Sequence, residues 1–153
     1  MKERSVVHAT FVIEEKYPAP SERAFAAFAD PKKKRRWYGE GDESTLEQFD
    51  MDFRVGGKDR TVRRAKNGWT FVAESVYLDI LPNRHIVFAY TMSVGDKRIS
   101  SSQATVEFLP QLGGTMLIFT EQGAYLEGAD GPKMREEGWR LLLGQLADAL
   151  AIP

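Results

Sequence analysis

The sequence predicts an α+β fold in which a curved sheet of seven antiparallel strands wraps around a long C-terminal helix. Three observations lead to this prediction. β-branched and aromatic residues dominate the segment Val6 to Tyr17. Turn residues recur at short spacings between Thr45 and Gln122, and apolar residues repeat with a helical period after Pro132. We expect residues 1–153 to form a single domain, because the length suits one core and no repeat or linker interrupts it.

The N-terminal segment predicts one strand followed by two short helices. Val6 to Tyr17 has the composition of a long strand, and the prolines behind it end the ladder because proline has no N–H to donate. Ser21 stands where the N-cap of the first short helix is expected. Asp30-Pro31 then starts a second short helix, which carries the sequence KKKRRWY.

The middle of the chain predicts six more strands. Asn67-Gly68 is the strongest hairpin signal and indicates a type I′ turn with both residues in the left-handed region. Further reversals are indicated by Gly56-Gly57, Pro82-Asn83, Gly95-Asp96 and Gly113-Gly114.

The last segment predicts a helix of about five turns. Its apolar face consists of Trp139, Leu142, Leu143, Leu146 and Leu150. Such a face needs an apolar surface to cover, and the sheet is the only large one available. Because a strongly bent sheet does not lie flat on one helix, we expect a cavity between them.

Alternation along the strands predicts which polar residues point into this cavity. Val72, Val76, Leu78 and Ile80 share one face, which places Glu74 inward. The same reasoning places Tyr90, Ser102 and Glu121 inward, with Arg63 and Asp59 as further candidates. A buried carboxylate costs several kcal/mol unless it is paired or protonated. Glu74 or Glu121 therefore either orients a ligand, acts as a general base, or lies at a wet strand end or beside Arg63.

Large aromatic side chains are candidates for the cavity walls, although they suit an ordinary core equally well. The strongest are Trp37, after the short helices, and Trp139, on the long helix. Phe88, Tyr90 and Phe119 are predicted to face the same interior.

Charge and composition exclude several function classes. The formal net charge is -1, so the basic run Lys32 to Arg36 is interpreted as a solvated helix face rather than a nucleic-acid site. The sequence has no cysteine and only two histidines, His8 and His85, so we expect no metal. No dinucleotide or P-loop motif indicates a cofactor. No membrane span or signal peptide is predicted, which favours a cytoplasmic location.

Several strings resemble a known family. In chain order, from about Tyr17 to Leu150, they are YPAPSERAFAAFADP, RRWYG, FRVGG, YLDILPNRHIVF, ATVEFLP, GGTMLIFTEQG and EGWRLLLGQLADAL. Together they resemble the helix-grip superfamily, which includes the START domains and the major birch pollen allergen. Within it they are most similar to bacterial domains related to the C-terminal domain of the activator of Hsp90 ATPase. Where family members often place apolar pocket residues, this chain has Asp59, Thr61 and Arg63, which implies a partly polar pocket.

The resemblance implies a cavity under the long helix and leaves three functions open. The first is binding of a small hydrophobic or amphipathic molecule without catalysis. The second is an enzyme similar to cyclases and dehydratases of this fold, with an inward carboxylate as base and Tyr90 stabilising an oxyanion. The third is a protein-interaction module similar to the Hsp90 activator. A homodimer is a further expectation from the resemblance.

Overall fold

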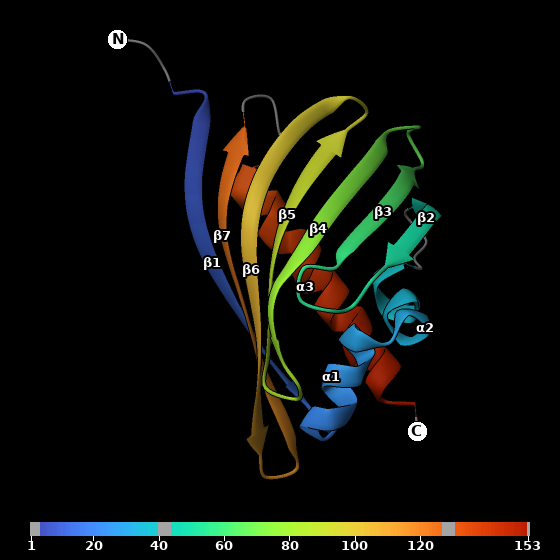
Figure 1. The fold of residues 1–153 in the computed structure, drawn as a ribbon, viewed down its shortest axis with the longest axis vertical. Helices are drawn as coiled ribbons and strands as arrows, with labels where there is room; N and C mark the ends of the chain where they lie inside the picture. Colours follow the sequence, from blue (N-terminus) through green and yellow to red (C-terminus); the bar gives the residue numbers. More distant parts are fainter. Residues whose placement is uncertain (1–3, 40–43, 127–130, 153) are drawn as a thin grey trace.

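Seven antiparallel strands form one sheet in the order β1-β7-β6-β5-β4-β3-β2 (Figure 1). The structure is a computed structural model and describes residues 4–39, 44–126 and 131–152. The predicted fold class is confirmed. The strands are β1 (Val6–Tyr17), β2 (Ser44–Met51), β3 (Lys58–Ala65), β4 (Thr70–Leu81), β5 (His85–Val94), β6 (Lys97–Gln111) and β7 (Gly114–Leu126).

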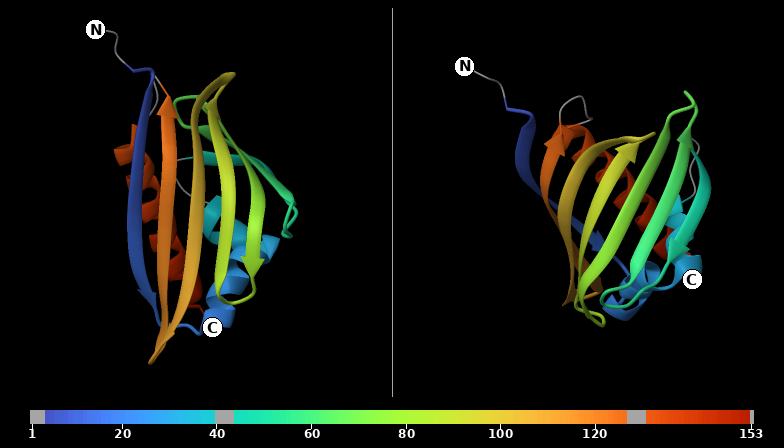
Figure 2. Two further views of the ribbon diagram at one scale, coloured as in Figure 1. Left: turned by 60° about the vertical axis from the view of Figure 1, so that its left-hand side comes forward. Right: turned by 45° about the horizontal axis from the view of Figure 1, so that its top comes forward.

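The helices all lie on one side of this sheet. They are α1 (Ser21–Ala29), α2 (Pro31–Lys34), the π-helical turn η1 (Arg35–Gly39) and α3 (Gly131–Leu150). Two further views show α3 running across the concave face, with no described helix over the opposite face (Figure 2). The backbone of α3 approaches β1, β7, η1 and α1. None of the described helices is long and apolar enough to span a bilayer.

The face of α3 that meets the sheet was predicted correctly. Trp139, Leu143, Leu146 and Leu150 are buried, whereas Leu142 is only half-buried. The Tyr17 hydroxyl, at the end of β1, donates a hydrogen bond of 2.9 Å to the Leu143 carbonyl. This bond and the apolar contacts fix the height of the helix above the sheet.

Two local predictions are wrong. Ser21 is the first residue of α1 and Pro20 is its N-cap, because the Ser21 hydroxyl is buried and lies 3.1 Å from the Thr115 hydroxyl of β7. The Asn67-Gly68 hairpin is not a type I′ turn. Only Gly68 has a positive φ, and Ala65 donates to the Trp69 carbonyl across a three-residue loop, in which one left-handed residue suffices.

Strand orientation is confirmed for β5, β6 and β7 and wrong for most of β4. Ala73 and Tyr77 are buried, and Glu74 between them is exposed on the outer face. Both faces of β4 carry apolar residues, so alternation alone does not distinguish them. A bulge between Tyr77 and Asp79 then returns Ile80 to the core side, as predicted.

Candidate functional site

A cleft of about 260 Å³ opens between α3 and the half of the sheet farther from β1. Its sheet wall comes from β3, β4 and β5, its helix wall from α3, and one further side chain from η1. Most of its surface is apolar. The lining residues are Tyr38, Thr61, Arg63, Phe71, Ala73, Tyr90, Met92, Met134, Arg135, Gly138, Trp139, Leu141 and Leu142.

The cleft exists because α3 packs closest to β1 and β7, at the opposite side of the sheet. The helix wall is also recessed at Gly138, where an added Cβ would meet nothing within 4 Å. Tyr38 stacks on Trp139 with ring centroids 6.1 Å apart. The cleft is thus a space between packed elements whose walls are fixed by aromatic contacts.

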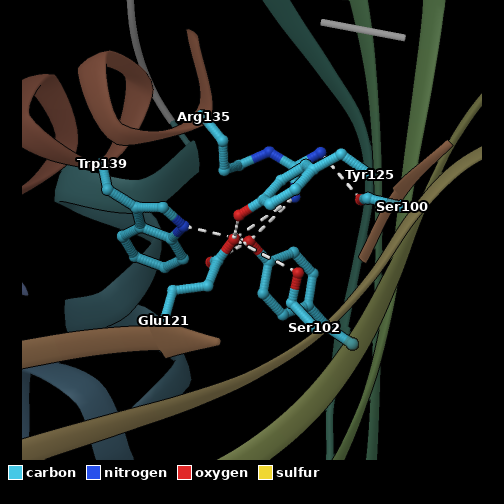
Figure 3. Close-up of polar contacts among 7 residues, drawn as sticks. Ser100, Ser102, Glu121, Tyr125, Arg135 and Trp139 are labelled. Atoms are coloured by element: carbon cyan, nitrogen blue, oxygen red, sulfur yellow. Dashed lines mark hydrogen bonds and ion pairs between the residues drawn. The ribbon is translucent and has the colours of Figure 1, made fainter. Parts of the chain in front are cut away.

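Behind the cleft, a buried polar network surrounds Glu121 of β7 (Figure 3). The Glu121 side chain is fully buried and accepts hydrogen bonds from Ser102 (3.2 Å), Tyr125 (2.6 Å) and Tyr90. Arg135 of α3 lies 3.7 Å from the same carboxylate. The charge is therefore compensated and hydrogen-bonded, as a buried carboxylate requires.

Tyr90 connects this network to the cleft. Its hydroxyl donates to Glu121 and accepts from Arg135 and from the Trp139 indole N–H, both at 3.1 Å. A phenol has one donor and two acceptor sites, so all its capacity is used. Burial, and next the Glu121 carboxylate, raise the pKa of Tyr90 well above its usual value, so it remains an O–H donor at neutral pH.

Tyr125 reaches Glu121 only because Gly123 stands between them on the same face of β7. The Tyr125 ring lies over Gly123, where an added Cβ would come 2.7 Å from the Tyr125 hydroxyl. Burial, followed by the hydrogen bond to Glu121, raises the pKa of Tyr125. The absent side chain at position 123 is thus part of the network.

Three of the predicted site residues line the cleft: Arg63, Tyr90 and Trp139. Phe119 and Phe88 lie behind Trp139, with ring centroids 4.3 Å and 6.5 Å from it. Ser102 and Glu121 belong to the network and do not line the cleft. Glu74 is on the opposite face of the sheet, so it does not face the cavity as predicted.

Trp37 lies away from the cleft. Its buried indole donates to the Ala27 carbonyl at 2.8 Å and packs on Phe28 at 4.7 Å. It borders a second cavity, of about 500 Å³, between α1, η1 and the end of α3. That cavity is larger, but its lining includes four charged side chains, Arg23, Lys33, Arg36 and Asp148. Ligand sites typically have mainly apolar walls with few polar groups.

A second buried carboxylate, Asp59 of β3, lies beyond the inner end of the cleft. It accepts hydrogen bonds from the Tyr77 hydroxyl and, at 3.2 Å, from the Asp52 backbone N–H, and Lys34 lies 3.5 Å away. The space bordered by these groups measures about 10 Å³, room for no more than about one water. No three His, Cys, Asp or Glu side chains within residues 4–39, 44–126 and 131–152 form a possible metal site.

Sequence reasoning missed Arg135 as a member of the site. It lies four residues before Trp139, on the same helix face, so helical spacing could have indicated it. Its Nη2 also donates to Ser100 at 2.8 Å. A cation on an otherwise apolar helix face is a signal that a carboxylate lies opposite.

The comparisons with known proteins agree with this fold. Residues 18–151 match the model of the family described as activator of Hsp90 ATPase homolog 1-like protein. The chain belongs to this family. It has the helix-grip fold, as the resemblance in the sequence implied. No curated protein matches the sequence.

Solved structures of bacterial proteins are similar to this chain over nearly its whole length. An uncharacterised protein from Rhizobium leguminosarum is 37% identical, with 99% of this chain and 100% of that chain covered and a TM-score of 0.94. The protein Mll3558 from Rhizobium loti is 43% identical, with 95% and 99% covered and a TM-score of 0.88. An AHSA1-like protein from Aeromonas hydrophila, 20% identical with 94% and 92% covered and a TM-score of 0.70, shares the fold.

Proposed function

We propose that residues 1–153 act as one domain that binds a small amphipathic molecule in the cleft under α3. The observation that carries the proposal is an open, mostly apolar cleft whose walls are held by a fully satisfied buried network. Its volume of about 260 Å³ lies just below the roughly 300–1,000 Å³ of drug-sized ligand sites, which favours a small ligand.

Binding is favoured over the cyclase-like alternative because that chemistry needs a carboxylate at the cleft. Glu121 is enclosed and does not line it, and Glu74 is on the other face of the sheet. Tyr90 has no donor left for an oxyanion, because its hydroxyl already donates its one hydrogen bond to Glu121. Catalysis by these groups would require the network to open first.

The proposal is tested by blocking the cleft from the helix side. Gly138 and Gly144 are both exposed on α3 with open space around an added Cβ, but only Gly138 lines the cleft. In an NMR titration with 1-octanol, the amides of Phe71, Met92 and Gly138 should shift and saturate. Gly138→Phe should abolish the shifts at Phe71 and Met92, and Gly144→Phe should leave them unchanged. Equal behaviour of the two variants, or no saturable shift in the wild type with either 1-octanol or octanoate, would reject the cleft as a binding site.

The family description gives a second candidate, stimulation of the Hsp90 ATPase. Measuring the ATPase rate of Hsp90 with added protein tests it, and an unchanged rate would dispose of it.

The proposal also includes a cytoplasmic location, which the absence of cysteine from the sequence supports. It further includes the pairing of two copies. Sedimentation at several protein concentrations tests the pairing.

A further inference from the structure

Among the described residues, two guanidinium groups line the cleft, Arg63 from β3 and Arg135 from α3, and no described aspartate or glutamate lines it. These two cations differ in one respect. Arg135 is neutralised by Glu121 at 3.7 Å and directs further donors to Ser100 and Tyr90. Its charge therefore serves the network that fastens α3 to the sheet.

Arg63 has no such counter-charge among the residues that the structure describes. Its guanidinium donates one hydrogen bond to the Tyr38 carbonyl and lies 4.8 Å from the centroid of the Tyr38 ring. No carboxylate in the described part of the chain forms an ion pair with it, and its neighbours across the strands are Leu46 and Phe71. A guanidinium has five N–H donors, so most of them are available at the cleft.

The next residue on the same strand gives a contrast, because it lies on the outer face and has a counter-charge. Arg64 points outward, is exposed, and pairs with Glu47 of β2 at 2.5 Å. Arg63 is half-buried beside apolar side chains, where a lone cation gains more from an anion than an exposed one does. The fork of N–H groups matches the two oxygens of a carboxylate.

We propose that the ligand of the cleft is a small amphiphile with a single carboxylate, which pairs with Arg63. Its apolar part then lies against side chains that have no polar group to offer: Phe71, Met92, Met134, Leu141 and Leu142. This inference rests on the proposed function of the same cleft. It adds the chemical class of the ligand and the residue that selects it.

The test compares three eight-carbon probes with different head groups: octanoate, 1-octanol and octylammonium. Affinities are measured from the saturating shifts of the Phe71 and Met92 amides. Octanoate should bind the wild type at least about tenfold more tightly than 1-octanol, because hydrogen bonds to a charged group are the stronger ones. Octylammonium should bind more weakly than both, since it brings a second cation beside Arg63.

Variants identify the residue responsible. Arg63→Met should remove the preference for octanoate while 1-octanol still binds, and Arg63→Lys should restore part of it. Arg64→Met, the matched control on the outer face, should keep the wild-type order of affinities. Thermal unfolding followed by circular dichroism verifies that each variant is folded.

The outcomes separate the two proposals. If 1-octanol binds as tightly as octanoate, or if Arg63→Met keeps the preference, the carboxylate inference is overturned while ligand binding stands. If none of the three probes shifts the cleft amides, the proposed function fails and the inference fails with it.

Discussion

At the scale of single residues, Glu121 and Glu74 show that one step of strand register decides whether a carboxylate is buried or exposed. Glu121 has no exposed surface and meets three hydroxyl groups and Arg135. Glu74 is exposed to solvent on the outer face. The first is a structural charge on which the position of α3 depends, and the second is a surface charge.

The two carboxylates give a matched pair of variants. Glu121→Gln should lower the free energy of unfolding by about 3 kcal/mol, because it removes the negative charge from a buried pair with Arg135. Glu74→Gln should change it by less than about 0.5 kcal/mol. Urea unfolding at pH 7 measures both. Similar losses in the two variants would contradict the claim that the buried pair of Glu121 and Arg135 stabilises the fold.

Gly123 permits a second test of the network at this scale. Gly123→Ala places a methyl group 2.7 Å from the Tyr125 hydroxyl, so the ring must move and its hydrogen bond to Glu121 is lost. We expect a loss of about 1–3 kcal/mol, typical when a buried acceptor loses a donor. Tyr125→Phe removes the same bond without a clash and should cost no more. In the double variant the two losses should not add, and full additivity would argue against a shared cause.

At the scale of elements, the sequence predicted the order of strands and helices but not every inward face. On β5 to β7 the aromatic side chains, such as Phe88, Phe108 and Phe119, all lie on the inner face, so alternation indicated the correct face. On β4 the outer residues Val72 and Val76 are as apolar as the inner ones, and a bulge after Tyr77 changes the register. A strand that is apolar on both faces gives alternation nothing to distinguish.

The π-helical turn η1 was also outside the reach of sequence reasoning. The run KKKRRWY was predicted to continue one short helix, whereas the structure changes from α2 to η1 at Arg35. This turn places Trp37 in the core and Tyr38 at the cleft. A single π-helical turn depends on tertiary packing around it, and no residue pattern within the run marks it.

Helix α3 carries glycines that its packing does not require. Neither Gly138 nor Gly144 has an atom within 4 Å of an added Cβ. Gly138→Ala and Gly144→Ala should each raise the free energy of unfolding by up to about 1 kcal/mol, because alanine loses less backbone entropy in a helix. Gly57→Ala should instead lower the free energy of unfolding, since its Cβ would clash with the Asp52 carbonyl oxygen. Thermal melts of the three variants test the set, and a lower midpoint for Gly138→Ala would contradict the open wall of the cleft.

At the scale of the whole molecule, four tyrosines use their hydroxyls to link strands of the sheet to one another or to α3. They are Tyr17, Tyr77, Tyr90 and Tyr125. Burial is the largest cause of a raised pKa in each, with nearby carboxylates adding to it. The fold is thus held in part by neutral phenols, and for each of them the net effect of its surroundings opposes loss of the proton.

This arrangement predicts a loss of stability in alkali. Below pH 10 these tyrosines are protonated in both states, so their contribution is complete. Above pH 10 the unfolded chain releases their protons while the folded chain retains them, so the free energy of unfolding falls as pH rises. Each tyrosine contributes a slope of up to about 1.4 kcal/mol per pH unit. Tyr17→Phe should make the slope between pH 10 and 11.5 shallower by the contribution of one tyrosine, up to about 1.4 kcal/mol per pH unit. Other groups that titrate in this range affect both proteins equally. Urea unfolding across this range measures the difference, and parallel curves for the wild type and Tyr17→Phe would show that the phenol ionises as readily in the folded protein as in the unfolded chain.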